Sequence, residues 1–220
     1  METNESVSFQ RVLQELSDRG FLLMSDANLP SVTGIVAQEP IRGSWWGHAK
    51  GREIFAVSEQ LSIHQDVLVT KLVSGKVTFV HRPLWPALVQ IAGSRDAWQL
   101  DGISGVAQSL LSKATQDGVV RTDLLNEFEA PKSKILGQAV LELENRLLVY
   151  SEQVHTESGA HAKALESWEH WAGRTGFVKQ EMSVEFAKNE FEARLEDLNF
   201  RFRARGELPW KALKPKRGRR

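Results

Sequence analysis

The chain has 220 residues, of which 28 are Lys or Arg and 28 are Asp or Glu, so its formal net charge is zero. It contains no cysteine, which excludes disulfides, thiolate nucleophiles and cysteine-ligated zinc. A hydrophobic share of 41% with 25% charged residues is typical of a globular protein and excludes disorder throughout. The N-terminus is polar and acidic, unlike a signal peptide, and no apolar stretch reaches the roughly eighteen residues of a membrane span. We therefore expect a cytoplasmic protein that makes no membrane contact.

Helical periodicity predicts three helices in the first part of the chain, at residues 5–19, 28–36 and 49–61. Gly20 is suited to cap the end of the first helix, and an apolar run at residues 21–24 follows it. Pro30 suits the start of the second helix, because its missing amide is not needed there. The side chains expected to face the core are Val7, Val12, Leu13 and Leu16 in the first helix and Ile54, Phe55, Val57 and Leu61 in the third.

A β-hairpin gives the clearest strand signal. β-Branched residues are frequent in residues 66–73 and 76–81, and Ser74 and Gly75 separate the two runs. We expect a tight turn there, with Gly75 supplying the positive φ. Residues 84–91 then predict a further short helix.

A second unit with the same order of elements follows a change in composition at residues 93–96. The expected helices cover residues 103–116, 123–128 and 132–145, and the expected strands cover residues 147–154 and 160–165, with a turn at residues 156–159. The side chains expected to face the core from the third of these helices are Ile135, Leu136, Val140 and Leu143. Two successive units of three helices and a hairpin are thus predicted, although no sequence repeat is visible.

Aromatic residues mark the helices expected near the C-terminus. Residues 167–172 predict a helical turn ended by Gly173, and residues 182–203 predict a long helix. The apolar side chains expected along one side of the long helix are Phe186, Phe191, Leu195, Leu198 and Phe202. That stripe is either a packing face or, if it is left unpacked, the seam of a homodimer.

Charge is unevenly distributed along the chain. Between Arg203 and Arg220 there are eight Lys or Arg and one acidic residue, so the preceding 202 residues carry a net charge of minus seven. A basic tail on an acidic body is typical either of a nucleic-acid contact or of a solubilising terminus.

These elements predict an α+β, mostly helical chain in three parts, at residues 1–95, 96–176 and 177–220. The order of three helices and a hairpin resembles a winged helix, most closely over residues 103–165. The resemblance implies that the helix at residues 132–145 enters the major groove of DNA, although winged helices also bind proteins. The side chains that would face DNA are Lys132, Ser133, Lys134 and Gln138 from that helix and His155, Thr156, His161 and Lys163 from the wing.

The whole chain is also distantly similar to the multi-winged-helix DNA glycosylases that unhook crosslinks in bacteria. Those enzymes carry a catalytic Gln-x-Gln motif, and this sequence contains none. The resemblance implies a shared architecture and contact with DNA, and we assign no catalytic residue.

The most unusual segment is residues 42–52, where cations alternate with aromatic residues and glycines. Cations fix phosphates, aromatic rings stack on bases or sugars, and glycines allow close backbone approach. Backbone amides at the start of the next helix can also bind an anion. The alternative is that both tryptophans fill the core, which is difficult for two consecutive residues. The candidate DNA-binding residues of this segment are Arg42, Trp45, Trp46, His48, Lys50 and Arg52.

Other motifs carry less chemistry. His155 and His161 are six residues apart across a glycine turn, unlike the helical spacing of a metalloprotease, so we expect a polar hairpin tip and no metal. A strand rather than a helix follows residues 74–76, so they form a hairpin turn and not a phosphate loop. Lys76 can still touch phosphate as a wing residue does. No motif predicts a cofactor.

Three functions are consistent with the sequence. The first is a DNA-binding protein, regulatory or repair-associated, that contacts double-stranded more than single-stranded DNA, mainly through phosphates. The second is a DNA-processing hydrolase of glycosylase type, with His48 or Glu53 as the acid–base group. The third is a protein-interaction module built on the acidic body and the aromatic C-terminal helix. Residues 42–52 and the basic tail make the first the leading hypothesis.

Overall fold

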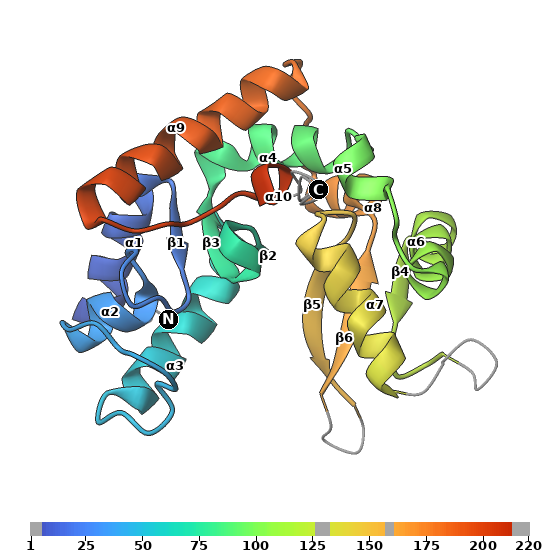
Figure 1. Cartoon of the computed structure of the whole chain (residues 1–220). Coiled ribbons are helices and arrows are strands. Elements are labelled where there is room, and N and C mark those ends of the chain that lie inside the picture. The colour runs from blue at the N-terminus through green and yellow to red at the C-terminus, as the bar shows by residue number, and fades with distance from the viewer. Residues whose placement is uncertain (1–5, 126–132, 157–160, 213–220) are drawn as a thin grey trace, which may run out of the picture. The chain divides into compact units, whose positions relative to one another are not determined.

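The computed structural model describes residues 6–125, 133–156 and 161–212 and confirms the α+β class (Figure 1). Of these described residues 54% are helical, and the others include two small three-stranded antiparallel sheets. It divides into two compact units, which we call unit 1 (Met1–Ala87 with Glu185–Ala212) and unit 2 (Leu88–Val184). Within the described part of the chain, no helix has the length and apolarity needed to cross a membrane.

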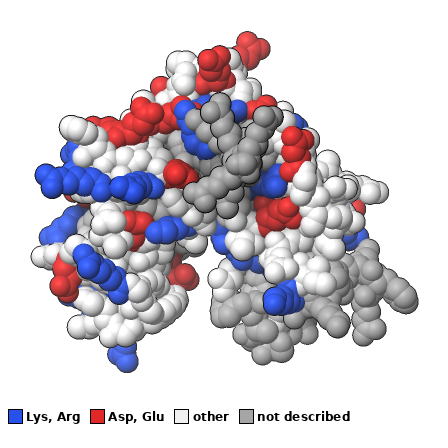
Figure 2. All heavy atoms as spheres, in the orientation of Figure 1, with Lys and Arg blue, Asp and Glu red and all other residues white. Residues whose placement is uncertain are grey.

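Positive and negative side chains are interspersed over the visible face of each unit (Figure 2). Many of the basic side chains are engaged by carboxylates, as Arg19 is by Glu15 and Arg82 by Asp66. A basic binding surface is therefore expected where cations lack such a partner.

Unit 1 follows the order helix, strand, helix, helix, strand, strand, and the end of the chain returns to it. Its elements are α1 (Val7–Arg19), β1 (Phe21–Leu23), α2 (Val32–Ala37), α3 (Gly51–Ser62), β2 (Val67–Lys71), β3 (Val77–His81), the start of α4 (Trp85–Ala92), α9 (Val184–Phe202) and α10 (Pro209–Ala212). The sheet has the order β1-β3-β2, with Phe21 opposite Val80 and Val69 opposite Phe79. The sequence predicted the hairpin of β2 and β3. It did not predict the third strand of this sheet, β1, which is only an apolar run in the sequence.

Short polar side chains set the helix starts of unit 1. The hydroxyl of Ser6 accepts from the Phe9 amide, and that of Ser31 accepts from the Gly34 amide, as N-caps do. The predicted start of α2 near residue 28 is therefore wrong, because Ser31 caps the helix and residues before it form a turn. Gly20 ends α1 in the left-handed region (φ 84°), which confirms the predicted C-cap.

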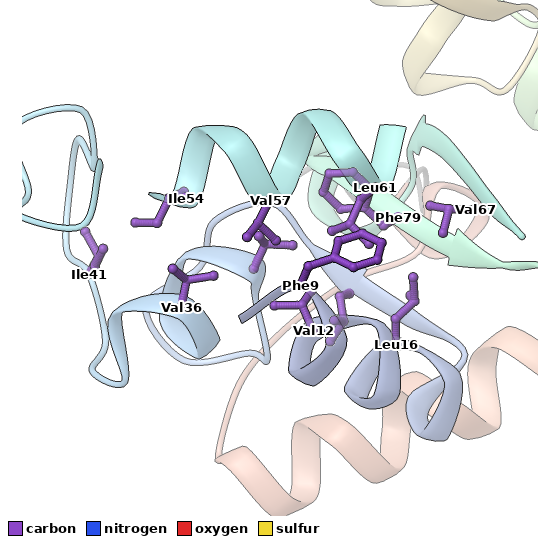
Figure 3. Close-up of a cluster of buried hydrophobic side chains, with 12 residues drawn as sticks. Phe9, Val12, Leu16, Val36, Ile41, Ile54, Val57, Leu61, Val67 and Phe79 are labelled. Atoms are coloured by element: carbon purple, nitrogen blue, oxygen red, sulfur yellow. The ribbon is translucent and has the colours of Figure 1, made fainter. Parts of the chain in front are cut away.

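The core of unit 1 lies between α1, α2, α3 and the sheet, with side chains from each pointing toward one another (Figure 3). Its fully buried members include Val12, Leu16 and Ile54, each with no more than traces of exposed surface. Two predicted core residues are wrong, because Val7 is 78% and Phe55 45% exposed. In α3 the buried stripe runs through Ile54, Val57, Ser58 and Leu61, and Phe55 lies about 100° away from Ile54 on the helix.

The connection between β2 and β3 is longer than the predicted two-residue turn. It spans residues 72–76 and includes a single turn of 3₁₀ helix at Val73–Gly75. Gly75 has the predicted positive φ (68°), and Ser74 has a positive φ as well (52°). A tertiary contact holds Ser74 in place, because its amide donates to the Glu207 carbonyl at 2.7 Å and its hydroxyl accepts from the Glu207 amide at 3.2 Å.

Unit 2 has its own three-stranded sheet, in the order β4-β6-β5. Its elements are the end of α4, α5 (Ala97–Leu100), α6 (Gly105–Asp117), β4 (Val119–Arg121), α7 (Ser133–Asn145), β5 (Tyr150–His155), β6 (His161–Glu166) and α8 (Trp168–Thr175). Strand β4 was not predicted. The helix expected at residues 123–128 is wrong in its first half, because residues 123–125 are not helical, and residues 126–128 lie outside the described residues. The predicted strand at residue 147 begins only at Tyr150, since Leu147 has a positive φ of 53°.

The core of unit 2 packs α6 and α7 against the sheet, with Leu143, Leu148 and Leu165 completely buried. The prediction that Ile135 faces this core is wrong, because it is 46% exposed. Helix α8 passes through the predicted stop at Gly173 and ends at Gly176, which adopts a left-handed φ of 67°.

Helix α9 uses its apolar stripe inside unit 1. Phe191, Leu195 and Leu198 are buried, and the Phe191 ring lies 6.2 Å from that of Phe21. Phe186 and Phe202 are 56% and 37% exposed, so the expected stripe is packed only in its middle. The packed side chains belong to the core of unit 1 and are not available as a seam between two copies of the chain.

Candidate nucleic-acid interface

The segment between α2 and α3, which we call the tryptophan loop (residues 41–50), lies beside the first turn of α3 (Figure 1). Two consecutive turns shape it, since the His48 amide donates to the Trp45 carbonyl at 3.0 Å and the Gly51 amide donates to the His48 carbonyl at 2.8 Å. These turns delay the start of α3 from the predicted residue 49 to Gly51. Ile41, only 8% exposed, anchors the other end of the loop in the core of unit 1.

The two tryptophans of the loop stack on each other. Their ring centroids are 4.1 Å apart and their planes differ by 22°. Trp45 is half-buried and packs against the core, whereas Trp46 is 67% exposed. The exposed ring of Phe55 on α3 extends this surface, with its centroid 5.8 Å from that of Trp46. The sequence left open whether the tryptophans fill the core or face a ligand. In the structure Trp45 packs against the core, and Trp46 faces solvent.

Gly51 allows this close approach of loop and helix. A Cβ atom at Gly51 would lie 3.1 Å from the Trp46 carbonyl oxygen and 3.2 Å from that of Trp45, which is tighter than ordinary contact. A Cβ atom at Gly47, in contrast, would meet nothing within 4 Å. The first turn of α3 therefore sets the position of the tryptophan backbone.

Two arginines, Arg42 in the tryptophan loop and Arg52 in the first turn of α3, have no carboxylate partner among the described residues. Both side chains are exposed, and neither guanidinium group makes a hydrogen bond or ion pair with any residue that the structure describes. Arg52 lies three positions before Phe55 on α3, so the two side chains occupy neighbouring places on one helix face. These guanidinium groups are available to an anionic ligand without first breaking an ion pair.

Lys50 is instead held by Glu53, with 2.7 Å between Nζ and Oε2. The hydrogen bond from Lys50, followed by one from the Ser8 hydroxyl, lowers the pKa of Glu53 below its ordinary value. Glu53 is thus a carboxylate at neutral pH and is not suited to act as a general acid. Its charge also occupies the first turn of α3, where an anion was expected to bind.

His48 has both ring nitrogens engaged. Nδ1 accepts from the Lys50 amide at 3.1 Å, and Nε2 lies 3.0 Å from Oε1 of Glu39. An accepting Nδ1 places the proton of the neutral ring on Nε2, which then donates to Glu39. The ring therefore fastens the tryptophan loop to residue 39, and this geometry does not favour an acid–base role. Glu39 was not singled out from the sequence, because nine residues separate it from His48.

A shallow, open depression of about 470 Å³ borders the loop. Its lining residues are Glu39, Pro40, Ile41, Arg42, Ser44, Gly47 and His48. Arg42 therefore lies at the edge of a hollow that can admit a phosphate or sugar.

Lys76 lies in the connection between β2 and β3 and forms an ion pair with Asp26, with 2.6 Å between Nζ and Oδ2. Burial alone would raise the pKa of Asp26, but hydrogen bonds from Lys76 and from the Asn28 and Leu29 amides outweigh it and hold the pKa below its ordinary value. Lys76 thus also stabilises the turn before α2, and its side chain remains 48% exposed.

The described candidate residues of unit 2 lie mainly on two elements, α7 and β6. Lys134 and Gln138 are exposed one turn apart on α7. Lys163 forms an ion pair with the buried Glu144, with 2.9 Å between Nζ and Oε1. Lys132 lies outside the described residues, and so does the side chain of His155, whose backbone ends β5.

Exposed apolar side chains accompany these residues on α7, since Ile135 is 46% and Leu141 is 42% exposed.

Among the described residues, no group of three or more His, Asp or Glu is arranged to hold a metal ion. Comparison with protein families, with curated proteins and with solved structures finds no match for this chain.

Proposed function

We propose that the protein binds DNA through the tryptophan loop and the exposed face of α3. The observation that carries the proposal is the exposed Trp46 stacked on Trp45, together with Arg42 in the same loop and Arg52 in the first turn of α3, which have no partner among the described residues. Guanidinium groups neutralise phosphates, and indole rings stack on bases or sugars, so the two kinds of side chain together suit a nucleic acid.

The element order of unit 1 supports this assignment. Helix, strand, helix, helix and hairpin resembles a winged helix, in which the helix before the hairpin enters the major groove. In unit 1 that helix is α3, which carries Arg52 and Phe55 on exposed positions. Lys76 in the connection between the hairpin strands then takes the position of a wing residue.

The test is the fluorescence anisotropy of labelled duplex DNA, titrated at several salt concentrations. The full chain is compared with the double variant Arg42→Ala/Arg52→Ala, with Lys179→Ala as a control for removing an exposed charge in unit 2, and with a chain ending at Ala212. Each phosphate contact contributes about 0.9 to the slope of log K against log salt. We expect the double variant to bind more weakly, with a slope smaller by about 2 if both arginines contact phosphate.

The control and the shortened chain decide where DNA binds. Weak binding by the double variant, with Lys179→Ala unchanged, supports a site on unit 1. If the chain ending at Ala212 does not bind and the double variant binds like the full chain, the site lies in the tail and the proposal is wrong. A second pair of variants, Gly51→Ala and Gly47→Ala, tests whether DNA binding depends on the geometry of the loop. Only the Cβ atom added at Gly51 crowds the tryptophan backbone, so Gly47→Ala is the control.

A protein-binding function is the second candidate, and it concerns α7. Its exposed Ile135 and Leu141 lie beside Lys134 and Gln138, and apolar side chains on a solvent-facing helix favour a protein partner over a phosphate backbone. Replacing Ile135 and Leu141 by serine is expected to leave DNA binding unchanged and to abolish any association seen in analytical ultracentrifugation.

A further inference from the structure

We infer that the exposed indole of Trp46 is a stacking site for an unpaired nucleobase, so that the protein recognises DNA where a base has left the duplex. This inference rests on the proposed function and names the form of DNA that the site accepts. It requires a free aromatic face, a rigid support for that face and cations placed to hold the adjoining phosphates.

The aromatic face is open on one side. Trp45 covers one face of the Trp46 ring at a centroid distance of 4.1 Å, yet 67% of Trp46 remains exposed. Phe55 meets it at 5.8 Å with planes 39° apart, a tilted contact that does not cover the ring. Bases inside a duplex already stack on both faces, so only an unpaired or terminal base has a π-face to place there.

The support for this ring is built before any ligand binds. Trp45 packs on the core of unit 1, two backbone turns fix the loop, and the His48–Glu39 contact closes it. A surface that is already ordered loses little conformational entropy when it binds. The fold does not need Trp46 for its core, because a side chain so exposed buries little apolar area.

Charge argues for a nucleic acid over an apolar protein surface. Arg42 and Arg52 would have to be buried without a carboxylate partner under an apolar protein, which is costly. A nucleotide instead supplies an anionic phosphate on each side of the base that stacks. The alternation of cations and aromatic rings is that of proteins that bind single strands.

The experiment uses the full chain and 2-aminopurine, a base whose fluorescence changes on stacking. The probe is placed in three oligonucleotides of equal length: within a blunt duplex, in a single-stranded DNA tail, and in a single-stranded RNA tail on the same duplex. Protein variants are Trp46→Ala, Trp46→Phe and, as a matched exposed aromatic elsewhere in unit 1, Phe200→Ala. Circular dichroism melting checks that each variant is folded.

We expect the full chain to change the fluorescence of the tail probe and to bind tailed DNA more tightly than blunt duplex. Trp46→Ala should lose about 5- to 150-fold in affinity for the tail, with little change for the blunt duplex, and Trp46→Phe should retain most of the affinity. Phe200→Ala should behave as the full chain does. Tighter binding of the RNA tail would assign the unpaired base to RNA while supporting the stacking site.

Two negative results are distinguishable. If no oligonucleotide binds at low salt, the proposed function fails. If blunt and tailed DNA bind equally, or if Trp46→Ala binds the tail as well as the full chain does, the stacking site is wrong and the proposed phosphate contacts stand.

Discussion

Replacing Glu166 by glutamine should destabilise unit 2. Glu166 is 4% exposed at the end of β6, where its carboxylate accepts from His170 Nδ1 at 2.6 Å and from Arg174 Nε at 2.9 Å and Nη2 at 2.7 Å. An amide keeps the shape but removes the charge, and it replaces one of the two acceptor oxygens by a donor. The substitution therefore turns a donor of the buried side chain toward a group that is itself a donor and weakens the remaining hydrogen bonds.

The size of the loss follows from these contacts. A hydrogen bond to a charged group contributes roughly 1.5–3 kcal/mol, but Arg174 is 46% exposed and its share is reduced by solvent. We expect Glu166→Gln to lower the free energy of unfolding by about 2–4 kcal/mol. Urea denaturation followed by tryptophan fluorescence measures this loss, since Trp168 and Trp171 lie in the adjacent α8. The matched control is Glu169→Gln on the exposed side of α8, which should cost less than about 1 kcal/mol.

The stability lost in Glu166→Gln should also depend on pH. Burial alone would raise the pKa of Glu166, but the hydrogen bonds from Arg174 and His170 outweigh it and lower the pKa below its ordinary value of 4.5. Because the folded-state pKa is lowered, the contribution of this carboxylate is fully present above the unfolded-state pKa and is lost as pH falls through the folded-state pKa. The gap between the full chain and Glu166→Gln should therefore be constant near pH 7 and should narrow below about pH 4.5. A loss no larger than that of Glu169→Gln, or a gap that does not narrow in acid, would contradict the stabilising role of the Glu166 carboxylate.

Two further predictions concern packing and backbone conformation. Leu16→Ala should cost about 2–5 kcal/mol in a urea titration because Leu16 is completely buried, whereas Val7→Ala, at a residue 78% exposed, should change stability by less than about 0.5 kcal/mol; equal effects would contradict the packing described for α1. Gly118→Ala should destabilise unit 2 by about 1–3 kcal/mol, because Gly118 has a φ of 81° and a Cβ there would lie 2.5 Å from Cδ2 of His170. Gly173→Ala, inside α8 with open space around it, should instead raise the thermal midpoint, and a rise for both variants would argue against the strain at Gly118.

Helix positions were the part of the fold that local sequence predicted best. Periodic apolar residues and a terminal glycine located α1 almost to the residue, and the break at Gly118 ended α6 as expected. Helix starts were less accurate where a tertiary or turn contact moved them, as Ser31 does for α2 and the turn at His48 does for α3. Strands β1 and β4 were not recognised, because three residues are too few for a periodic signal and their pairing partners are distant in sequence.

The sequence predicted where the candidate site lies along the chain, but not which side chains are exposed there or which of them lack a partner. Clustered cations, tryptophans and glycines in residues 42–52 marked the segment without any knowledge of the fold. The sequence does not show which cations are free to bind an anion, because their carboxylate partners are distant in the chain. Asp26, the partner of Lys76, is 50 residues away, and Glu144, the partner of Lys163, is 19 residues away. Phe55 was assigned to the core, and its place beside Trp46 depends on the rotation of α3.

The α+β class, most of the helices, both hairpins and the unusual chemistry of the tryptophan loop were predictable from the residues alone, because they follow from short-range periodicity and residue type. Which of the two consecutive indoles faces solvent, and which arginines lack a partner among the described residues, depends on the tertiary structure. It also decided that the middle of α9 is packed inside unit 1. Those outcomes depend on contacts between residues far apart in the chain, whose geometry is set by close packing rather than by local preference.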